Sequence, residues 1–459
     1  MTQPPFFWGA SLSAHQTEGA VAVDGKQPSV QDTRQRTDHT IADFTVAVDH
    51  YHRFKEDFRL LAEMGVNALR LSFAWTRIMA ADGTINPKGL AHYDDVINTL
   101  LALNITPIVT TYHFDLPDAL QQAGGWHNPA TINAYRQYTR VLFEHFGDRV
   151  KYWLTINEPN IMLLADTKII GSHDTNEGRY RSFYNMMIAE KYAIQQCHAL
   201  IPDGQIGPVP NISYVYPLTA RPEDVRAALD FNAIRNWAYL DFSVKCQINP
   251  VFKAHLAQLG IDLAILPEHR ALVADNRPDF IGFNYYTTAT VSFPQAGEAR
   301  AAGVSDQQSE DVYEPNFYKG VTNPYLKKNA FNWTVDPLGL QTSLEQTNDR
   351  YGLPILVTEN GLGAYDELTA DHQVHDDYRI DYLTQHLAAI DAARANGVPV
   401  QGYLPWSSID LISVHEGIRK RYGFIFVDRT DDDVKTMQRY PKDSYYWFKH
   451  VIEERSHQS

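Results

Sequence analysis

The chain of 459 residues is 44% hydrophobic, which is enough for a large buried core, and its formal net charge is −15. This negative balance argues against a nucleic acid or an anionic membrane as a partner, because both would repel the protein. Against such a background, a local cluster of basic residues becomes more informative.

The start of the chain and its two cysteines favour a cytoplasmic location. Residues 1–5 lack the basic and long apolar segments of a signal peptide, and no apolar run is long enough to cross a bilayer. We expect Cys197 and Cys246 to be reduced thiols, with a disulfide between them as the open alternative. The sequence leaves open whether the chain forms a homo-oligomer.

Short apolar runs alternate with amphipathic stretches along the whole chain. The eight runs predicted as strands are residues 6–13, 68–75, 106–113, 152–159, 205–212, 279–286, 354–361 and 400–408. The stretches predicted as helices are residues 50–64, 87–103, 130–146, 183–200, 222–244, 337–350, 376–395 and 444–454. Such α/β alternation fits a closed (β/α)8 barrel, the TIM-barrel fold, better than an open sheet. We therefore expect one domain over residues 1–459.

Two stretches lack any periodicity, residues 25–45 and residues 295–332. Both follow predicted barrel strands, on the side where barrel enzymes carry their active-site loops. We expect both to be substrate-side loops. A linker is the alternative for the second stretch, although no second domain fits beside it.

Two predicted strands end in a glutamate flanked by Thr and Asn. The motifs are Leu154-Thr155-Ile156-Asn157-Glu158-Pro159 and Val357-Thr358-Glu359-Asn360-Gly361. Because the carboxyl ends of barrel strands meet at one face, the two carboxylates are expected to converge on one bond. Glycoside hydrolysis needs this arrangement, since one carboxyl donates a proton to the leaving oxygen and the other attacks or activates water. Two locally satisfied strand ends are the weaker alternative, because a buried glutamate is rare unless paired.

Further polar and aromatic residues stand at the ends of other predicted strands. They are Gln16, Arg70, His113, Asn157, Tyr286 and Trp406. A sugar requires side chains that donate and accept hydrogen bonds, together with an aromatic face. Each residue alone could be a satisfied core group, but together they indicate a carbohydrate site.

The two glutamate motifs resemble those of glycoside hydrolase family 1, the retaining β-glucosidase family. Further matching segments are Asp49-His50-Tyr51-His52-Arg53 and Tyr112-His113-Phe114-Asp115-Leu116-Pro117, and the resemblance covers essentially the whole chain. It implies that Glu158 is the acid/base and Glu359 the nucleophile. The resemblance also implies binding roles for Asn157 at the sugar 2-hydroxyl, for Gln16, His113 and Trp406 at the remaining glycone, for Tyr286 and Arg70 at the nucleophile, and for Trp333 at the aglycone.

The segment after the last predicted strand departs from ordinary members of that family. Where those members carry a Glu that binds two glycone hydroxyls, this chain has Ser413, and Val414 replaces the Trp that follows. Just downstream comes Arg419-Lys420-Arg421-Tyr422. Hydroxyl and ammonium donors suit a phosphate, which a Glu would repel. Ser413, Lys420 and Tyr422 therefore resemble the 6-phosphate site of the 6-phospho-β-glycosidase branch, allowing for a one-residue difference in loop length.

The expected substrate is a small-molecule phosphorylated β-glycoside, a 6-phospho-β-D-glucoside that is cleaved to glucose 6-phosphate and aglycone. The small Val414 favours the gluco type and the loop length the galacto type, so a 6-phospho-β-galactosidase or dual specificity stays open. A non-phosphorylated β-glucosidase, with the basic triplet as a solvated turn, also stays open, as does a catalytically inactive sugar-phosphate sensor. We expect no cofactor and no metal, because the sequence has neither a nucleotide-binding glycine pattern nor a zinc-binding His pair.

Overall fold

The computed structural model describes residues 6–34, 42–163, 175–298 and 312–456. Eight parallel strands form its centre: β1 (Phe7–Ser11), β2 (Ala68–Ser72), β3 (Thr106–Tyr112), β4 (Tyr152–Asn157), β5 (Gln205–Val209), β7 (Ile281–Asn284), β11 (Ile355–Glu359) and β12 (Val400–Tyr403). Each lies inside one of the apolar runs predicted as strands, so that prediction is confirmed. The observed strands stop earlier than the runs, whose last residues already belong to loops.

The strands follow one another around a barrel in the order β5-β4-β3-β2-β1-β12-β11-β7. Backbone hydrogen bonds also connect the two outer strands of this order. The amide of Asp279 donates to the carbonyl of Ile206 at 3.0 Å, and the amide of Asn284 donates to the carbonyl of Pro210 at 3.1 Å. The predicted (β/α)8 barrel is therefore confirmed.

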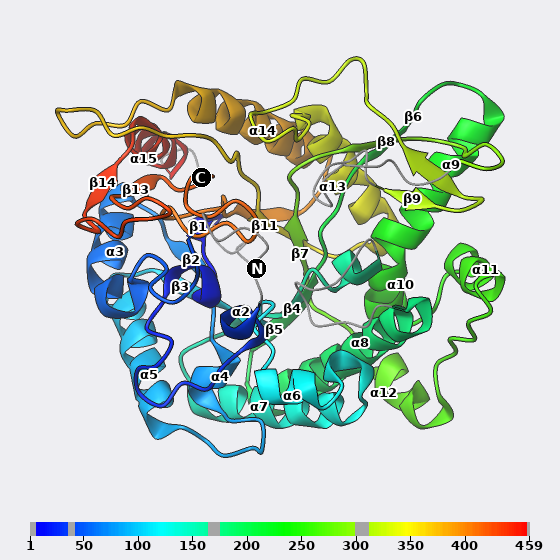
Figure 1. The fold of residues 1–459 in the computed structure, drawn as a ribbon, viewed down its shortest axis with the longest axis horizontal. Coiled ribbons are helices and arrows are strands. Elements are labelled where there is room, and N and C mark those ends of the chain that lie inside the picture. The colour runs from blue at the N-terminus through cyan, green and yellow to red at the C-terminus, as the bar shows by residue number, and fades with distance from the viewer. Residues whose placement is uncertain (1–5, 35–41, 164–174, 299–311, 457–459) are drawn as a thin grey trace.

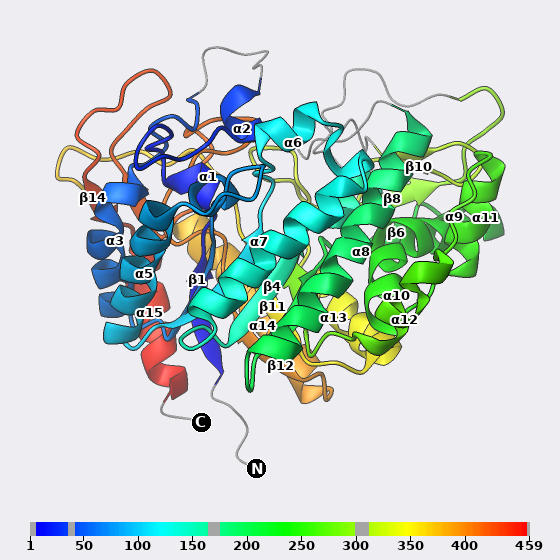
Figure 2. The same ribbon diagram turned by 90° about the horizontal axis from the view of Figure 1, so that it is seen from below.

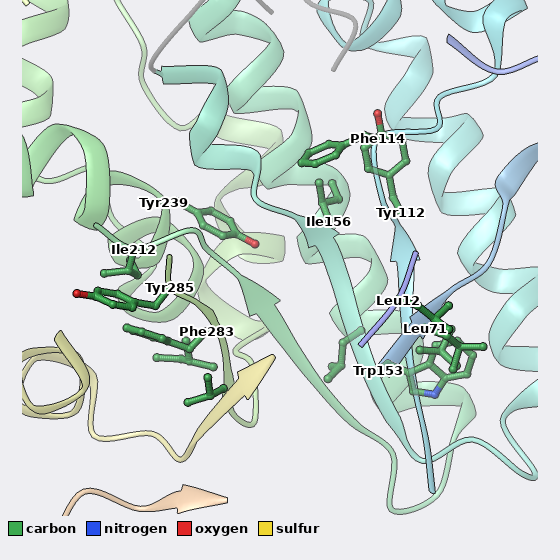
Figure 3. Packing of buried hydrophobic residues seen from close by; sticks show 14 of the residues in the cluster. Leu12, Leu71, Tyr112, Phe114, Trp153, Ile156, Ile212, Tyr239, Phe283 and Tyr285 are labelled. Atoms are coloured by element: carbon green, nitrogen blue, oxygen red, sulfur yellow. The ribbon is translucent and has the colours of Figure 1, made fainter. Parts of the chain in front are cut away.

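The barrel has an inner and an outer hydrophobic layer. Side chains of the inner layer come from every barrel strand or the residue next to it: Phe7, Ala68, Ile108, Leu154, Val209, Phe280, Leu356 and Leu404. Neighbouring residues such as Trp153 belong to the larger outer cluster, because successive side chains of a strand point to opposite faces. Figure 3 shows part of this outer cluster, including Trp153 and Leu71.

Helices surround the strands as a ring (Figure 1). The long ones are α3 (His50–Met64), α5 (Pro87–Ala102), α7 (Ala130–Phe146), α8 (Asn176–Leu200), α13 (Pro337–Tyr351), α14 (Asp377–Ala395) and α15 (Asp443–Ser456). Local chemistry sets their ends. In α13 the side chain of Asp336 caps the amide of Gly339 at 2.9 Å, Pro337 is the first residue, and Gly352 ends the helix at a left-handed φ of 66°.

Short helices follow several barrel strands and lie at the carboxyl end of the barrel (Figure 2). They are α1 (Ala14–Thr17), α2 (Val30–Thr33), α4 (Trp75–Ile78) and α6 (Asp118–Gln122). Other small elements are η1 (Gly125–His127), η2 (Pro159–Leu163), α11 (Pro250–Gln258), η4 (Pro267–His269), α12 (Arg270–Asp275) and the hairpin strands β13 (Ile425–Val427) and β14 (Arg439–Pro441).

Several parts of the chain differ from the sequence prediction: α8 begins at Asn176 rather than at residue 183, and the short helices α11 and α12 are not predicted. The single helix predicted over 222–244 consists of α9 (Pro222–Phe231), the π-helical turn η3 (Asn232–Asn236) and α10 (Trp237–Lys245). A small second sheet was not predicted. Its strands are β6 (Val215–Pro217), β8 (Ala289–Ser292), β9 (Tyr313–Glu314) and β10 (Tyr318–Gly320). These strands are too short to show a period, and the last two lie in the predicted loop 295–332.

Residues 1–5 lie outside the described residues, as do parts of both predicted loops, 35–41 and 299–311. Among the described helices, none combines the length and the apolarity that a bilayer-spanning segment requires. Cys197 and Cys246 are both free cysteines, so they do not form a disulfide.

Candidate active site

The two glutamates singled out by the sequence stand at the carboxyl end of the barrel. Glu359 is the last residue of β11, and Glu158 directly follows β4 with a left-handed φ of 48°. The amide of Glu158 donates to the carbonyl of Val209, at the end of β5, at 2.7 Å. Both side chains are buried. The barrel therefore brings together two carboxylates that are far apart in the sequence.

Each oxygen of the Glu359 carboxylate accepts a hydrogen bond from a side chain. The guanidinium of Arg70 forms an ion pair with Oε1, and the hydroxyl of Tyr286 donates to Oε2 at 2.6 Å. Arg70 comes from β2, is fully buried, and is held by a bond from its Nε to Thr110 Oγ1 of 2.8 Å. These contacts fix the orientation of the carboxylate before any substrate binds.

Two amide groups hold the other carboxyl group. Asn211 and Asn284 both donate from Nδ2 to Glu158 Oε1, at 2.9 Å and 2.8 Å. Thr358 donates to Asn284 Oδ1 at 2.7 Å, so the amide nitrogen of Asn284 faces Glu158. Burial, followed by the negative charge of Glu359, raises the pKa of Glu158 to about 7, while the two amide bonds act in the opposite direction. Glu158 is thus suited to hold a proton at neutral pH.

Asn157 connects the surroundings of the two carboxylates. Its Oδ1 accepts from Arg70 Nη2 at 2.6 Å and from Asn284 Nδ2 at 3.2 Å. Its Nδ2 therefore faces His113 Nε2, at 3.2 Å. One continuous network links the partner of Glu359 to the partner of Glu158.

His113 and Trp406 form the next part of the site. Their rings are stacked, with centroids 5.8 Å apart and planes at 21°. Burial, with Arg70 nearby, holds the pKa of His113 well below its usual value, so the ring is neutral. Since its Nε2 accepts from Asn157, the proton lies on Nδ1, which has no partner among the described residues. His113 Nδ1 is thus a buried donor without a partner among the described residues, and the glycone contact expected of His113 stays a prediction.

Gln16 is already held by the protein. Its Nε2 donates to the carbonyl of Ile412 at 2.9 Å, and its Oε1 accepts from Ser13 Oγ at 2.8 Å. The bond to Ile412 ties α1 to the segment that follows β12. The glycone contact expected of Gln16 stays a prediction.

Ser413, Lys420 and Tyr422 lie on the segment that follows Trp406. Tyr422 packs with Trp406 and Tyr286. The ammonium of Lys420 lies 3.9 Å from the ring centre of Trp333 and 5.7 Å from that of Tyr422. Burial lowers the pKa of Lys420 to about 8.

Trp333 therefore contacts the ammonium of Lys420. Its ring also packs edge-on against Tyr286, with centroids 5.5 Å apart. It thus stands between the tyrosine that holds Glu359 and the buried ammonium. The aglycone contact expected of Trp333 stays a prediction.

The basic triplet is not an ordinary solvated turn. Arg419 is exposed, but Lys420 and Arg421 are buried. Arg421 pairs with Asp410 at 2.7 Å, and Lys442 reaches the other oxygen of Asp410 at 2.7 Å. The loop is thus built around fixed buried charges.

Some residues of the site were missed or left without a role by sequence reasoning. Asn284 is the last residue of β7, two positions before the predicted site residue Tyr286, and the sequence pattern does not predict its bond to Glu158. Asn211 follows β5, and Arg235 on the π-helical turn donates to Asn211 Oδ1 at 2.6 Å. No sequence signal marks Arg235. Glu416 accepts a hydrogen bond from Ser413, and no sequence signal marks it either.

No group of three or more His, Cys, Asp or Glu side chains that could hold a metal ion occurs in the part of the chain that the structure describes. The site is built instead from carboxyl, amide, guanidinium and aromatic groups. It can donate a proton from Glu158 and present the carboxylate of Glu359 to an electrophilic carbon.

Comparisons with known proteins agree with this geometry. The family model described as glycosyl hydrolase family 1 matches residues 3–457. Aryl-phospho-beta-D-glucosidase BglC from Bacillus subtilis is 38% identical over 97% of this chain and 96% of its own length. Phospho-cellobiase from Klebsiella oxytoca is 37% identical over 97% of both chains. A solved family 1 β-glucosidase from Thermotoga maritima superposes with a TM-score of 0.86 at 32% identity over 99% of both chains.

Proposed function

Since the chain belongs to glycosyl hydrolase family 1, we propose that it cleaves 6-phospho-β-D-glucosides to glucose 6-phosphate and an aglycone. The observation that carries this proposal is Lys420, a buried ammonium beside the carbohydrate site, with Ser413 and Tyr422 in the same loop. The relatives that are named phospho-β-glucosidases and phospho-cellobiase support the same substrate class.

The reaction is a double displacement. Glu359 attacks the anomeric carbon while Glu158 gives its proton to the leaving oxygen, so that a carbon–oxygen bond forms to Glu359 as the glycosidic bond breaks. In the second half, Glu158 takes a proton from water, whose oxygen attacks the same carbon and releases Glu359. The negative charge of Glu359 is one cause of the raised pKa of Glu158. Once Glu359 is esterified that charge is gone, which lowers the pKa and lets Glu158 act as a base.

The neighbouring residues supply binding and orientation. Arg70 and Tyr286 hold the nucleophile in place. Asn157 binds the sugar 2-hydroxyl, and His113 binds a further glycone hydroxyl. The other sugar contacts of this proposal come from Gln16 and Trp406 at the glycone and from Trp333 at the aglycone.

The phosphate binds to Ser413, Lys420 and Tyr422. An ammonium and two hydroxyl groups are donors, and charge-assisted bonds to phosphate are strong. Ser413 stands where ordinary members of the family are expected to carry a glutamate. The carboxylate of that glutamate would repel the phosphate, whereas the hydroxyl of Ser413 can donate to it. The gluco configuration is favoured by the small Val414. We also propose a cytoplasmic location, where the two free thiols would stay reduced.

The test is a comparison of kcat/KM on three nitrophenyl substrates: the 6-phospho-β-glucoside, the 6-phospho-β-galactoside and the plain β-glucoside. We expect the first to be hydrolysed best and the plain glucoside poorly. A preference for the plain glucoside contradicts the phosphate assignment. A preference for the phosphorylated galactoside contradicts only the gluco assignment.

A further inference from the structure

A carboxylate lies among the groups that are proposed to bind phosphate. Glu416 Oε2 accepts a hydrogen bond from Ser413 Oγ at 2.9 Å and lies 3.6 Å from Lys420 Nζ. One oxygen of Glu416 therefore contacts both a hydroxyl donor and the ammonium. In the proposed function, the same two groups bind an oxygen of the substrate phosphate.

Lys420 needs an anionic partner when no substrate is bound. Its side chain is fully buried, and its ammonium lies 4.7 Å from the ring centre of Phe331 and 3.9 Å from that of Trp333. Burial disfavours the charged form of such a group, and the carboxylate of Glu416 acts in the opposite direction on the pKa of Lys420. Glu416 thus helps to keep the ammonium charged.

The carboxylate of Glu416 can move away from Ser413 and Lys420 without a change in the backbone of the turn 413–417. Ser413 and Gly417 exchange two backbone hydrogen bonds, of 2.9 Å and 3.2 Å, and Gly417 has a left-handed φ of 66°. The backbone of the turn is therefore closed on itself, whereas the Glu416 side chain is 22% exposed. Rotation about its side-chain bonds moves the carboxylate into solvent while Ser413 and Lys420 stay in place.

We propose that Glu416 is a built-in competitor for the phosphate. Its carboxylate occupies the position of a phosphate oxygen between Ser413 and Lys420 in the free enzyme, and it rotates out when a 6-phosphorylated sugar binds. A phosphate dianion can replace the carboxylate, because its charge and several oxygens compensate Lys420 at least as well. The uncharged 6-hydroxyl of a plain glucoside cannot replace the carboxylate, because it has no charge to compensate Lys420. Glu416 is thus a specificity-determining residue, and this inference rests on the proposed function.

The variant Glu416→Gln tests the competition. It keeps the shape of the side chain but removes its charge, so KM for the nitrophenyl 6-phospho-β-glucoside should fall by about tenfold, equivalent to about 1.4 kcal/mol. The ratio of kcat/KM on the phosphorylated substrate to kcat/KM on the plain glucoside should rise by about the same factor, because the plain glucoside has no phosphate for which Glu416 competes. Because loss of the Glu416 charge lowers the pKa of Lys420 below its value of about 8, the assay is run at about pH 6, where Lys420 stays charged in both proteins. Glu63→Gln, at an exposed glutamate of α3, is the matched control and should change nothing.

An unchanged or higher KM for the phosphorylated substrate in Glu416→Gln would overturn the inference, because Glu416 would then be neutral or would support the site. A crystal structure with bound glucose 6-phosphate gives an independent measurement. We expect a phosphate oxygen near Ser413 Oγ and Lys420 Nζ, with the Glu416 carboxylate turned away. A carboxylate still bonded to Ser413 beside the phosphate would contradict the inference.

The variant Lys420→Met separates this inference from the proposed function. Selective loss of activity on the phosphorylated substrate in Lys420→Met, without a lower KM in Glu416→Gln, contradicts the role of Glu416 alone. A Lys420→Met variant with no selective effect contradicts the phosphate site itself.

Discussion

Glu158 has a pKa of about 7 because its carboxyl group is buried and lies near the negative charge of Glu359. The first half-reaction needs the protonated form. On a phosphorylated disaccharide, whose leaving alcohol requires a proton, kcat/KM should therefore fall as the pH rises through about 7, by about tenfold per unit. Lys420 loses its charge at a higher pH, about 8.

The variant Asn211→Ala tests whether Glu158 is the group whose loss of a proton causes this fall of kcat/KM at alkaline pH. Asn211 donates to Glu158 Oε1 at 2.9 Å and so stabilises the carboxylate form. Without this bond the pKa of Glu158 should rise, and the alkaline limb of the pH profile should move to higher pH. Asn396→Ala removes a similar amide bond, to Glu345 on the surface at 2.8 Å, and should leave the limb unmoved. A limb that stays in place in Asn211→Ala contradicts the assignment to Glu158.

The roles of the two glutamates can be separated with azide. Glu359→Gly should abolish hydrolysis, and any activity restored by azide should give the α-glycosyl azide, because azide then replaces the nucleophile on the opposite face. In Glu158→Ala, azide should attack the glycosyl-enzyme and give the β-azide. NMR of the products distinguishes the two anomers. A β-azide from Glu359→Gly would mean that the two roles are exchanged.

The segment between β12 and β13 depends on buried ion pairs rather than on a helix or strand of its own. Asp410 pairs with Arg421 and Lys442, each at 2.7 Å, and Arg379 pairs with Asp366 at 2.8 Å. Lys442 also contacts Asp366, so the pairs form one network. This network fixes the loop that carries Lys420 and Tyr422.

Removing one charge of that network should therefore destabilise the protein. Asp410→Asn leaves two buried cations without their shared partner, and breaking a buried pair in this way costs about 3–5 kcal/mol. Urea unfolding followed by circular dichroism measures the change. Asp432→Asn, on the exposed loop that follows, is the matched control and should have no effect. An Asp410→Asn protein as stable as the parent would show that the network does not hold the loop.

At the scale of elements, hydrophobic periodicity predicts the barrel strands and their helices, but it does not predict the π-helical turn or the small second sheet. Each of the eight barrel strands lies inside a predicted apolar run, and α3 and α7 have the predicted bounds. The π-helical turn η3 interrupts a stretch whose helical pattern continues, so nothing in the pattern marks it. The strands β9 and β10, of two and three residues, are formed by pairing across the second sheet and have no period of their own.

In the active site, too, residues at strand ends can be predicted from the sequence and residues on loops cannot. Glu158, Glu359, Arg70 and Tyr286 could be predicted because a barrel brings the carboxyl ends of its strands together. Arg70 and Glu359 are 289 positions apart in the sequence, and yet they form an ion pair. Asn211 and Glu416 lie on loops. Their contacts depend on the path of the backbone beyond the strand ends, which the sequence pattern does not specify.

At the scale of the whole molecule, the proposed function requires an acidic protein to bind a dianionic sugar, with the buried ammonium of Lys420 as the cationic partner. The formal net charge of −15 disfavours the approach of an anion, so the local site has to compensate for the global field. Lys420 can do so because it is buried against aromatic rings, where its charge is less screened by water.

The most direct test of this account is kcat/KM of Lys420→Met on the phosphorylated and the plain β-glucoside. Methionine keeps the apolar part of the side chain against Trp333 and removes the charge, while Lys435→Met, at a partly exposed lysine, serves as the control. A charge-assisted bond contributes about 1.5–3 kcal/mol, so we predict a roughly ten- to hundredfold loss on the phosphorylated substrate and little change on the plain one. Equal loss on both substrates, or better hydrolysis of the plain glucoside by the parent protein, would contradict the assignment of a 6-phospho-β-glucosidase.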